Sequence, residues 1–420
     1  MASTLLSHVA SDLCIGRPRV LTLPSSTPVA AVLAALRAGA DPFVFVDVDE
    51  PVASSGKKTG TATTYVKIGV ADIICYLCGD EGNLRNPAAA LGRPVSAIIS
   101  AGHGGVARRV DPHTSLLDAI DALLTDDCQA LLVPLHARAR KRHHHHVPLP
   151  SIDADCCVLT REDIVRHLFG SISHFSPVAA LTVAALGLVR RRDDAVLHAV
   201  RADADALDAI PLLRRAAADN TAVAVTDGED GALLGELCPG ALASCCDVVE
   251  PVTAAFAALS VGEAMAYIDC SMTQYAPPEF LVRAARAQLK DRGLDAMAEL
   301  VDAWDAAASR QPLSPSSSFS MSASSTSSDE DSPVAGRARR PRRLSSGSFG
   351  WRSTEDVVAC HSGSSLVAVM AQALAHRVGY VWVVDEVSGA LVGVVRFADV
   401  LAVLREHIRP QVLCRGTTIC

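Results

Sequence analysis

The chain has 420 residues, of which 50% are hydrophobic, 20% charged and 4% aromatic, and its formal net charge is −8. This length is enough for one large or two to three ordinary domains, and the mildly acidic balance excludes a general affinity for nucleic acid or anionic membranes. No uninterrupted apolar run reaches the roughly 20 residues of a membrane span. The composition therefore predicts a globular protein rich in small side chains, with neither a nucleic-acid nor a membrane partner.

The N-terminal sequence MASTLLSHVASDL lacks a basic region and already carries Asp12. This pattern disfavours a cleaved targeting peptide. The thirteen cysteines are odd in number and scattered along the chain, as expected for reduced thiols rather than for a disulfide framework. Together these features favour a cytoplasmic or nuclear location.

Four similar segments follow one another along the chain. In each, an amphipathic helix is followed by a β-rich run, a loop of variable length, a second strand and a second helix. The clearest internal match aligns VDPHTSLLDAIDALL from Val110 with VRADADALDAIPLL from Val200, which share Leu-Asp-Ala-Ile. We expect the repeats at 9–78, 91–170, 177–246 and 259–408. Because one strand pair cannot bury its own apolar face, we expect repeat one to pack on two and three on four.

The repeat resembles the CBS domain, a βαββα module that pairs into Bateman modules. The resemblance rests on LLVPL at 131–135 and on VVDEVSGALVGVVRFADVL at 383–401. Four copies, with a helical insert and a Ser-rich stretch inside the last, are similar to plant CBS proteins of the CBSX type and to the gamma regulatory subunits of SNF1-related and AMP-activated kinases. The resemblance implies an α+β fold of four CBS repeats forming two Bateman modules.

The same resemblance implies a non-catalytic regulatory or sensor protein that binds AMP, ADP or ATP and modulates a protein partner such as an SNF1-related kinase. In CBS domains that bind adenosine nucleotides, a hydroxyl residue and an aspartate three positions later hold the ribose at the start of the second helix. Repeat two keeps both, as Thr160 and Asp163, with Arg161 available for phosphate. Repeat one retains only Asp72 and repeat four only Asp399, and repeat three retains neither group.

These residues also fit a purely structural role. Thr160 and Asp163 match a capping box, in which the two side chains satisfy free N–H groups at the helix start. Asp72 and Asp399 can be first-turn acids that offset the helix dipole. The sequence therefore leaves open an interaction scaffold that has lost ligand binding. An enzyme is disfavoured, because no phosphate-binding glycine loop and no G-x-S-x-G motif occurs.

Two insertions are expected within the last repeat. Residues 277–304 carry apolar side chains at helical spacing and predict a helical insert. Residues 314–350 are Ser-rich, lack apolar periodicity and predict a disordered loop. Candidate phosphorylation sites in this loop are Ser327 and Ser328 before an acidic triplet, and Ser345 and Ser346 after a basic run.

A further loop is expected within repeat two, at 136–150. It is basic and carries four consecutive histidines. Consecutive histidines in a loop lack the ligand spacing of a rigid metal site. The sequence therefore predicts a solvated loop and no metal.

Overall fold

The computed structural model describes residues 7–15, 20–39, 41–48, 64–125, 128–134, 156–191, 194, 196–228, 231–272, 277–308, 352–353 and 357–413. The histidine-rich loop at 136–150 and the Ser-rich stretch at 314–350 lie outside these ranges. The same is true of the candidate phosphorylation sites Ser327, Ser328, Ser345 and Ser346.

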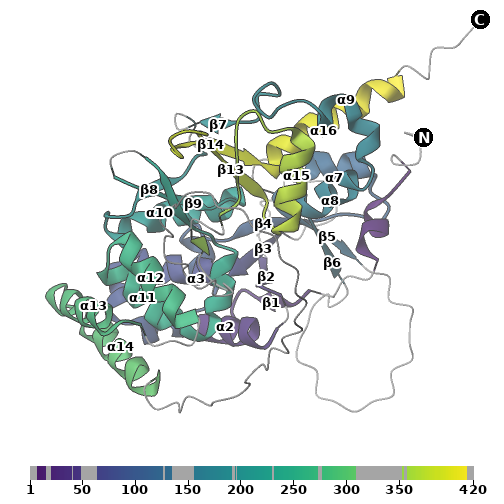
Figure 1. The fold of residues 1–420 in the computed structure, drawn as a ribbon. Coiled ribbons are helices and arrows are strands. Elements are labelled where there is room, and N and C mark those ends of the chain that lie inside the picture. The colour runs from purple at the N-terminus through teal and green to yellow at the C-terminus, as the bar shows by residue number, and fades with distance from the viewer. Residues whose placement is uncertain are drawn as a thin grey trace, which may run out of the picture.

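Helices and strands alternate in four units of the type β-α-β-β-α (Figure 1). Unit 1 consists of β1 (Thr22–Pro24), α2 (Val29–Ala38), β2 (Phe43–Val48), β3 (Thr64–Gly69) and α3 (Val70–Cys78). Unit 2 consists of β4 (Gly105–Arg109), α7 (Leu116–Leu124), β5 (Cys128–Pro134), β6 (Cys156–Thr160) and α8 (Arg161–Phe169). Unit 3 consists of β8 (Ala199–Arg201), α10 (Ala206–Asp219), β9 (Val223–Thr226), β10 (Leu233–Leu237) and α11 (Val249–Ala258), with the short helix η3 (Ala241–Val248) before α11. Unit 4 consists of β12 (Ala359–Cys360), α15 (Leu366–Ala375), β13 (Tyr380–Val384), β14 (Leu391–Arg396) and α16 (Phe397–Leu413).

Local sequence explains where the first helix of each unit begins. Side chains of Ser115, Asp205 and Ser365 accept backbone N–H groups in the first turns of α7, α10 and α15. Helix α2 instead follows Pro28, whose fixed φ suits a helix start. Helix α10 ends at Asn220, which adopts the left-handed conformation with φ 56°. The alternation of helix and strand confirms the predicted α+β class.

Units 1 and 2 share one six-stranded sheet with the order β1-β2-β3-β4-β5-β6. Its two halves meet where β3 pairs antiparallel with β4. The N–H of Val20, just before β1, donates to the carbonyl of Cys156 in β6 at 3.2 Å, so the outer edges of the sheet also approach each other. The curled sheet encloses a small apolar cluster of Val20, Phe45, Tyr65, Ala107, Ala130, Leu132, Cys156 and Val158.

Units 3 and 4 exchange edge strands. Strand β7 (Arg190–Arg191) precedes unit 3 but pairs with β14 of unit 4, and β11 (Arg352–Ser353) precedes unit 4 but pairs with β10 of unit 3. An isolated β-bridge between Ala232 and Ala390 joins the antiparallel pair β9–β10 of unit 3 to the antiparallel pair β13–β14 of unit 4. Trp382 of unit 4 donates its indole N–H to Glu236 of unit 3 at 2.6 Å in a buried setting. Each unit is therefore paired with its sequence neighbour.

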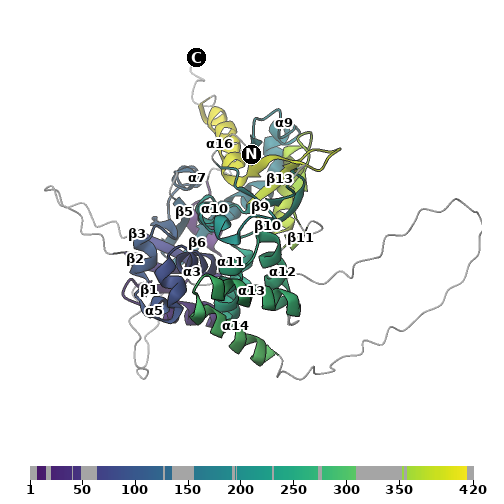
Figure 2. The ribbon, with the colours of Figure 1, turned by 90° about the vertical axis from the view of Figure 1, so that its left-hand side faces the viewer.

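Helices join the two pairs into one body. Helix α3 packs on α10 and α11, whereas α7 and α8 pack on α15 and α16. The two large cores follow this arrangement, one combining residues of units 1 and 3 and the other residues of units 2 and 4. Figure 2 shows the strands of unit 1 on one side of α3, α10 and α11, and those of unit 3 on the other.

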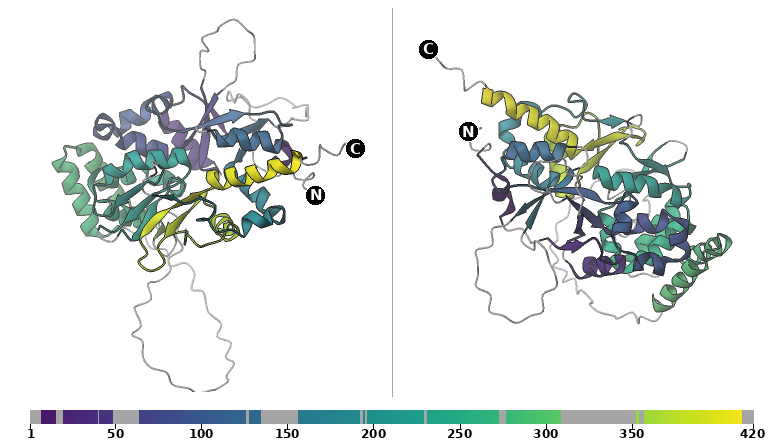
Figure 3. Two further views of the ribbon diagram at one scale, coloured as in Figure 1. Left: turned by 90° about the horizontal axis from the view of Figure 1, so that it is seen from above. Right: turned by 180° about the vertical axis from the view of Figure 1, so that it is seen from behind.

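The helical insert packs on unit 3. It comprises α12 (Val261–Met272), α13 (Glu279–Asp291) and α14 (Asp295–Ala308). All three helices contact α11, and α14 also contacts α4 (Glu81–Arg85). Both views of Figure 3 show α13 and α14, in green, at one end of the molecule and α16, in yellow, toward the other. The expected start of repeat four at 259 thus includes helices that pack on another unit, because their apolar faces extend the core of units 1 and 3.

The remaining described helices are short and cover the ends of the units. They are η1 (Ala10–Cys14), α5 (Pro87–Gly92), α6 (Ser96–Ser100), η2 (Ile172–Phe175) and α9 (Ser176–Ala179). One described segment, Ala241–Ala258, is long and apolar enough to cross a membrane by length and composition alone. Because 61% of it is buried inside the fold and α11 contacts α3 and α14, it serves here as a core helix.

Candidate functional site

A cavity of about 540 Å³ lies where all four units meet. Its volume is within the range of small-molecule and cofactor sites. Thr160 of unit 2 lines it, at the end of β6. The charged lining residues are Lys67, Asp72, Glu162, Arg214, Arg215 and Arg377. We call this space the central cavity; four cations and two acids make its lining attractive to an anion.

Asp72, one of the predicted site residues, faces the central cavity from the first turn of α3. Its Oδ2 accepts the N–H of Gly69 at 2.8 Å, and its Oδ1 accepts the N–H of Gly104 at 3.0 Å. Burial raises the pKa of Asp72, while these N–H groups and the charge of Lys67 oppose the rise. The carboxylate therefore caps α3 and also fixes the loop before β4. It retains free lone pairs on both oxygens.

Lys67 is a functional candidate that the sequence analysis missed. It lies on β3 with its ammonium 5.0 Å from the centroid of the Phe43 ring. Burial lowers the pKa of Lys67, and the negative charge of Asp72 counteracts this. A bound anion beside Lys67 would also favour its charged form and so oppose the effect of burial on its pKa. Its sequence neighbours Val66 and Ile68 are apolar, so only the strand alternation hints that Lys67 faces away from the core.

Thr160 and Asp163 form a capping box at the start of α8. The N–H of Thr160 donates to Asp163 Oδ2 at 2.8 Å, and the Thr160 hydroxyl donates to the same oxygen at 2.7 Å. The N–H of Asp163 donates in return to Thr160 Oγ1 at 3.4 Å. The structural role considered from the sequence is thus realised, and a ribose role for this pair stays a prediction.

Arg161 does not fit its predicted role at a phosphate. Its side chain is 8% exposed, its Nε donates to the carbonyl of Leu123 at 2.9 Å, and its Nη2 donates to that of Cys128 at 2.9 Å. Burial lowers the pKa of this guanidinium. Arg161 ties α8 to the end of α7 and the start of β5, because buried carbonyls at these ends need a donor.

Asp399 is engaged by two arginines. Arg190, which is 209 residues away on β7, donates Nη2–H to Asp399 Oδ1 at 2.6 Å, and Arg396 donates Nε–H to Oδ2 at 2.8 Å. Burial acts to raise the pKa of Asp399, but the hydrogen bonds from Arg396 and Arg190 hold it below its usual range. Asp399 is not among the residues that line the central cavity. It secures the exchanged strand β7 on unit 4, which the local motif does not reveal.

Comparison with known proteins identifies the family. The sequence model of the CBS domain matches residues 352–406. The chain is also 36% identical, over 97% of its length and 99% of the relative, to CBS domain-containing protein CBSX5 of Arabidopsis thaliana. The chain belongs to the CBS domain-containing proteins. A second such protein of the same plant, CBSX6, is 23% identical over 97% of this chain and 95% of its own length.

The fold of this CBS domain-containing protein is also found in a solved structure. Protein MJ1225 from Methanocaldococcus jannaschii, described as a candidate archaeal homologue of g-AMPK, superposes with a TM-score of 0.50 at 12% identity. The match covers 94% of this chain and 100% of that one. The four units are therefore CBS repeats. Within the described residues, no group of three or more His, Cys, Asp or Glu side chains is placed to hold a metal ion.

Proposed function

We propose that this CBS protein is a non-catalytic regulatory protein that binds an adenosine nucleotide in its central cavity and thereby controls a protein partner. The observation that supports this proposal is a cavity of about 540 Å³ to which all four repeats contribute side chains. A ligand held there contacts every repeat, so its binding energy favours one arrangement of the repeats over others. An SNF1-related kinase is the kind of partner that the family resemblance implies.

The chemistry of the lining suits a nucleotide. Arg214, Arg215 and Arg377 can donate charge-assisted hydrogen bonds to phosphate oxygens, and Lys67 supplies a further positive charge. The Thr160 hydroxyl can donate to or accept from a ribose hydroxyl, as in the predicted ribose contact with Asp163. Arg161 is left out of this arrangement, because it does not line the central cavity and two of its N–H groups donate to buried carbonyls.

The second candidate function is an interaction scaffold without a ligand. The observation that favours it is that the carboxylates of the three retained aspartates already accept protein hydrogen bonds. Under this alternative the cations of the central cavity would serve only solubility or long-range attraction.

A calorimetric titration separates the two functions. AMP and ATP are titrated into the full chain and into Arg215→Gln/Arg377→Gln, which removes two exposed cations of the central cavity. The matched control is Arg283→Gln, since Arg283 is exposed on α13 and pairs with Glu279. We expect the double variant to weaken nucleotide binding by about tenfold or more, because each arginine contributes a charge-assisted hydrogen bond. No heat with millimolar nucleotide, or equal binding by the double variant, would favour the scaffold.

Partner control requires its own measurement. The wild-type chain and the double variant are used to capture partners from plant extract with and without AMP. A kinase whose recovery or activity depends on AMP only with the wild-type chain supports the proposal. Equal recovery by both chains at every AMP concentration contradicts nucleotide control.

A further inference from the structure

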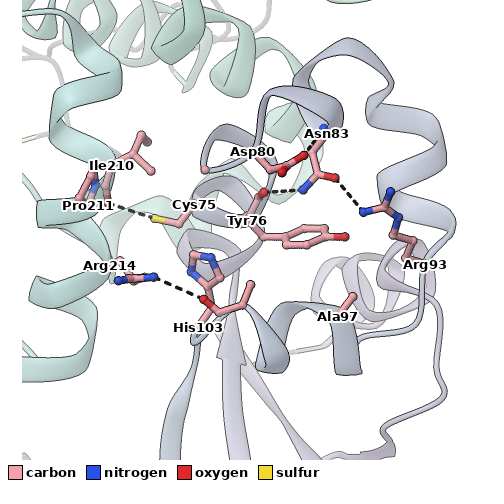
Figure 4. A pocket seen from close by; sticks show the side chains of 12 residues that line it. Cys75, Tyr76, Asp80, Asn83, Arg93, Ala97, His103, Ile210, Pro211 and Arg214 are labelled. Atoms are coloured by element: carbon pink, nitrogen blue, oxygen red, sulfur yellow. Dashed lines mark hydrogen bonds between the residues drawn. The ribbon is translucent and has the colours of Figure 1, made fainter.

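A second cavity, of about 400 Å³, lies between unit 1 and unit 3 (Figure 4). Its walls come from α3, α4, α6 and the loop before β4 on one side, and from α10 on the other. Two contacts tie these walls together: the Cys75 thiol lies 3.9 Å from the carbonyl of Ile210, and Arg214 donates to the carbonyl of Ala101 at 3.4 Å. We call this space the lateral cavity.

Two buried polar groups on the lateral cavity have no hydrogen-bond partner. Tyr76 is 5% exposed and His103 is 7% exposed, and neither Tyr76 Oη nor His103 Nδ1 has a partner within the part of the chain that the structure describes. Their rings lie edge to face, 6.5 Å apart. Leaving a buried donor or acceptor unpaired is destabilising, so such groups point to a missing partner.

An arginine lines the lateral cavity from each wall: Arg93, just after α5, from one side and Arg214, on α10 of unit 3, from the other. Arg93 is held by Asn83, which is 2% exposed: Arg93 Nη1 donates to Asn83 Oδ1 at 3.1 Å, and Asn83 Nδ2 donates to the carbonyl of Tyr76 at 2.9 Å. In Figure 4 the Tyr76 hydroxyl points to the side of Arg93, and His103 lies on the side of Arg214. Tyr76, Asn83 and His103 of this site are buried, whereas Arg93 and Arg214 are exposed. Each arginine is nevertheless positioned by a hydrogen bond, Arg93 to Asn83 Oδ1 and Arg214 to the carbonyl of Ala101.

The other residues that line the lateral cavity indicate which kind of ligand it can bind. Burial and, to a lesser extent, the charge of Arg214 lower the pKa of His103 to about 4, so the imidazole is neutral at pH 7. Asp80 is occupied at the N-terminus of α4, where its Oδ1 accepts the N–H of Asn83 at 3.0 Å. The apolar residues of the lining include Ala97 on α6 and Ile210 and Pro211 on α10. One cation and one neutral polar group at each side suit a singly charged acid group, and the apolar wall suits methylene groups.

We propose that the lateral cavity binds a short aliphatic dicarboxylate, with one carboxylate at Arg93 and Tyr76 and the other at Arg214 and His103. The planar guanidinium matches a carboxylate with two parallel hydrogen bonds, and the Tyr76 hydroxyl supplies a third donor. The volume and the mixture of apolar wall and few polar groups are those of a small-molecule site. This proposal does not depend on nucleotide binding in the central cavity.

Glutarate is the probe, titrated by calorimetry into the full chain at pH 7. The test variants are Tyr76→Phe, which removes only the hydroxyl, and Arg93→Gln. The matched control is Arg85→Gln, on the same helix region, since Arg85 is 60% exposed and pairs with Glu81. Arg214 is left unchanged, because it lines both cavities. We expect both test variants to weaken glutarate binding by about tenfold or more, as expected for loss of a hydrogen bond to a charged group.

Thermal unfolding distinguishes binding from a structural role. Without ligand, Tyr76→Phe should have an equal or higher melting temperature than wild type, because an unpaired buried hydroxyl is removed. With glutarate, the wild-type and Arg85→Gln melting temperatures should rise and that of Tyr76→Phe should rise less. The proposal is overturned if wild type shows neither heat nor a melting shift at about 10 mM glutarate, roughly a thousandfold above a Kd of about 10 μM, or if Arg93→Gln binds as wild type does. Loss of glutarate binding in Arg215→Gln/Arg377→Gln, which changes the lining of the central cavity alone, would also overturn it.

Discussion

Asp163 in the second CBS repeat and Asp399 in the fourth occupy the same position, three residues into the helix that follows the last strand. Asp163 accepts hydrogen bonds from its own helix start, including the hydroxyl of Thr160 at 2.7 Å. Asp399 accepts from Arg396, which replaces that hydroxyl residue, and from Arg190 on a strand that precedes the third repeat. One motif position thus serves a local cap in one repeat, whereas in the other it holds an ion pair with a long-range partner, Arg190 on the exchanged strand β7.

The largest loss of stability is expected when the long-range contact between Asp399 and Arg190 is removed. Asp399→Ala removes the carboxylate shared by two guanidiniums; Arg396, which is only 16% exposed, then keeps the more distant carboxylate of Asp219, 3.9 Å away. We expect the free energy of unfolding to fall by about 3 kcal/mol, toward the lower end for breaking a buried ion pair because Arg190 can still reach water. Urea denaturation measures this value. A loss below about 1 kcal/mol, as for an exposed pair, would mean that the two aspartates do not differ as the structure indicates.

Because of this ion pair, the stability of wild type and that of Asp399→Asn should respond differently to acid pH. Because hydrogen bonds from Arg396 and Arg190 outweigh burial and hold the pKa of Asp399 below its usual value of 3.8, its contribution is complete above that pH. It is lost as the pH falls through the lowered pKa. Between pH 4 and pH 2, the stability of wild type should therefore decrease more than that of Asp399→Asn. Parallel urea titrations at each pH test this, and equal slopes would contradict the assignment.

The smaller expected loss of stability belongs to the local cap. Asp163→Ala should lower the free energy of unfolding by about 0.5–2 kcal/mol. Its control is Asp118→Ala, because Asp118 makes a similar cap with Ser115, whose hydroxyl donates to it at 2.6 Å. Neither aspartate lines the central cavity, but Asp163 is hydrogen-bonded to Thr160, which does, whereas Ser115 does not. If the predicted ribose contact is real, only Asp163→Ala weakens AMP binding. Equal AMP binding by both folded variants would leave capping as the role of Asp163.

The smallest effect is expected from Thr160→Ser. The hydroxyl that joins Asp163 is kept and only a methyl group is lost, so stability should change by less than about 0.5 kcal/mol. AMP binding should be unchanged. Thr160→Val, which keeps the shape and removes the hydroxyl, is the contrasting variant and should lose the cap. Equal stability of the serine and valine variants would show that the hydroxyl does not stabilise α8.

Much of the fold was determined by the sequence alone. The spacing of Leu116, Ile120 and Leu123 predicts α7, and the Thr160–Asp163 pair marks the start of α8, because helix periodicity and capping depend on residues within one or two turns. The order of helix and strand, repeated four times, together with LLVPL at 131–135 and VVDEVSGALVGVVRFADVL at 383–401, carried the resemblance to CBS repeats. The same local pattern could not separate a ribose contact from a cap, since both use a hydroxyl and a carboxylate at the same spacing.

The tertiary structure alone decided the sites. The cations of the central cavity come from three repeats, and Asp399 meets Arg190 only because units 3 and 4 exchange edge strands. Arg161 was mispredicted for a related reason, because the carbonyls that use its donors belong to α7 and β5. Arg214 faces Tyr76 and His103 across the lateral cavity because α3 packs against α10. Such contacts depend on how similar units face one another, whereas the sequence pattern records only which face of each element is apolar.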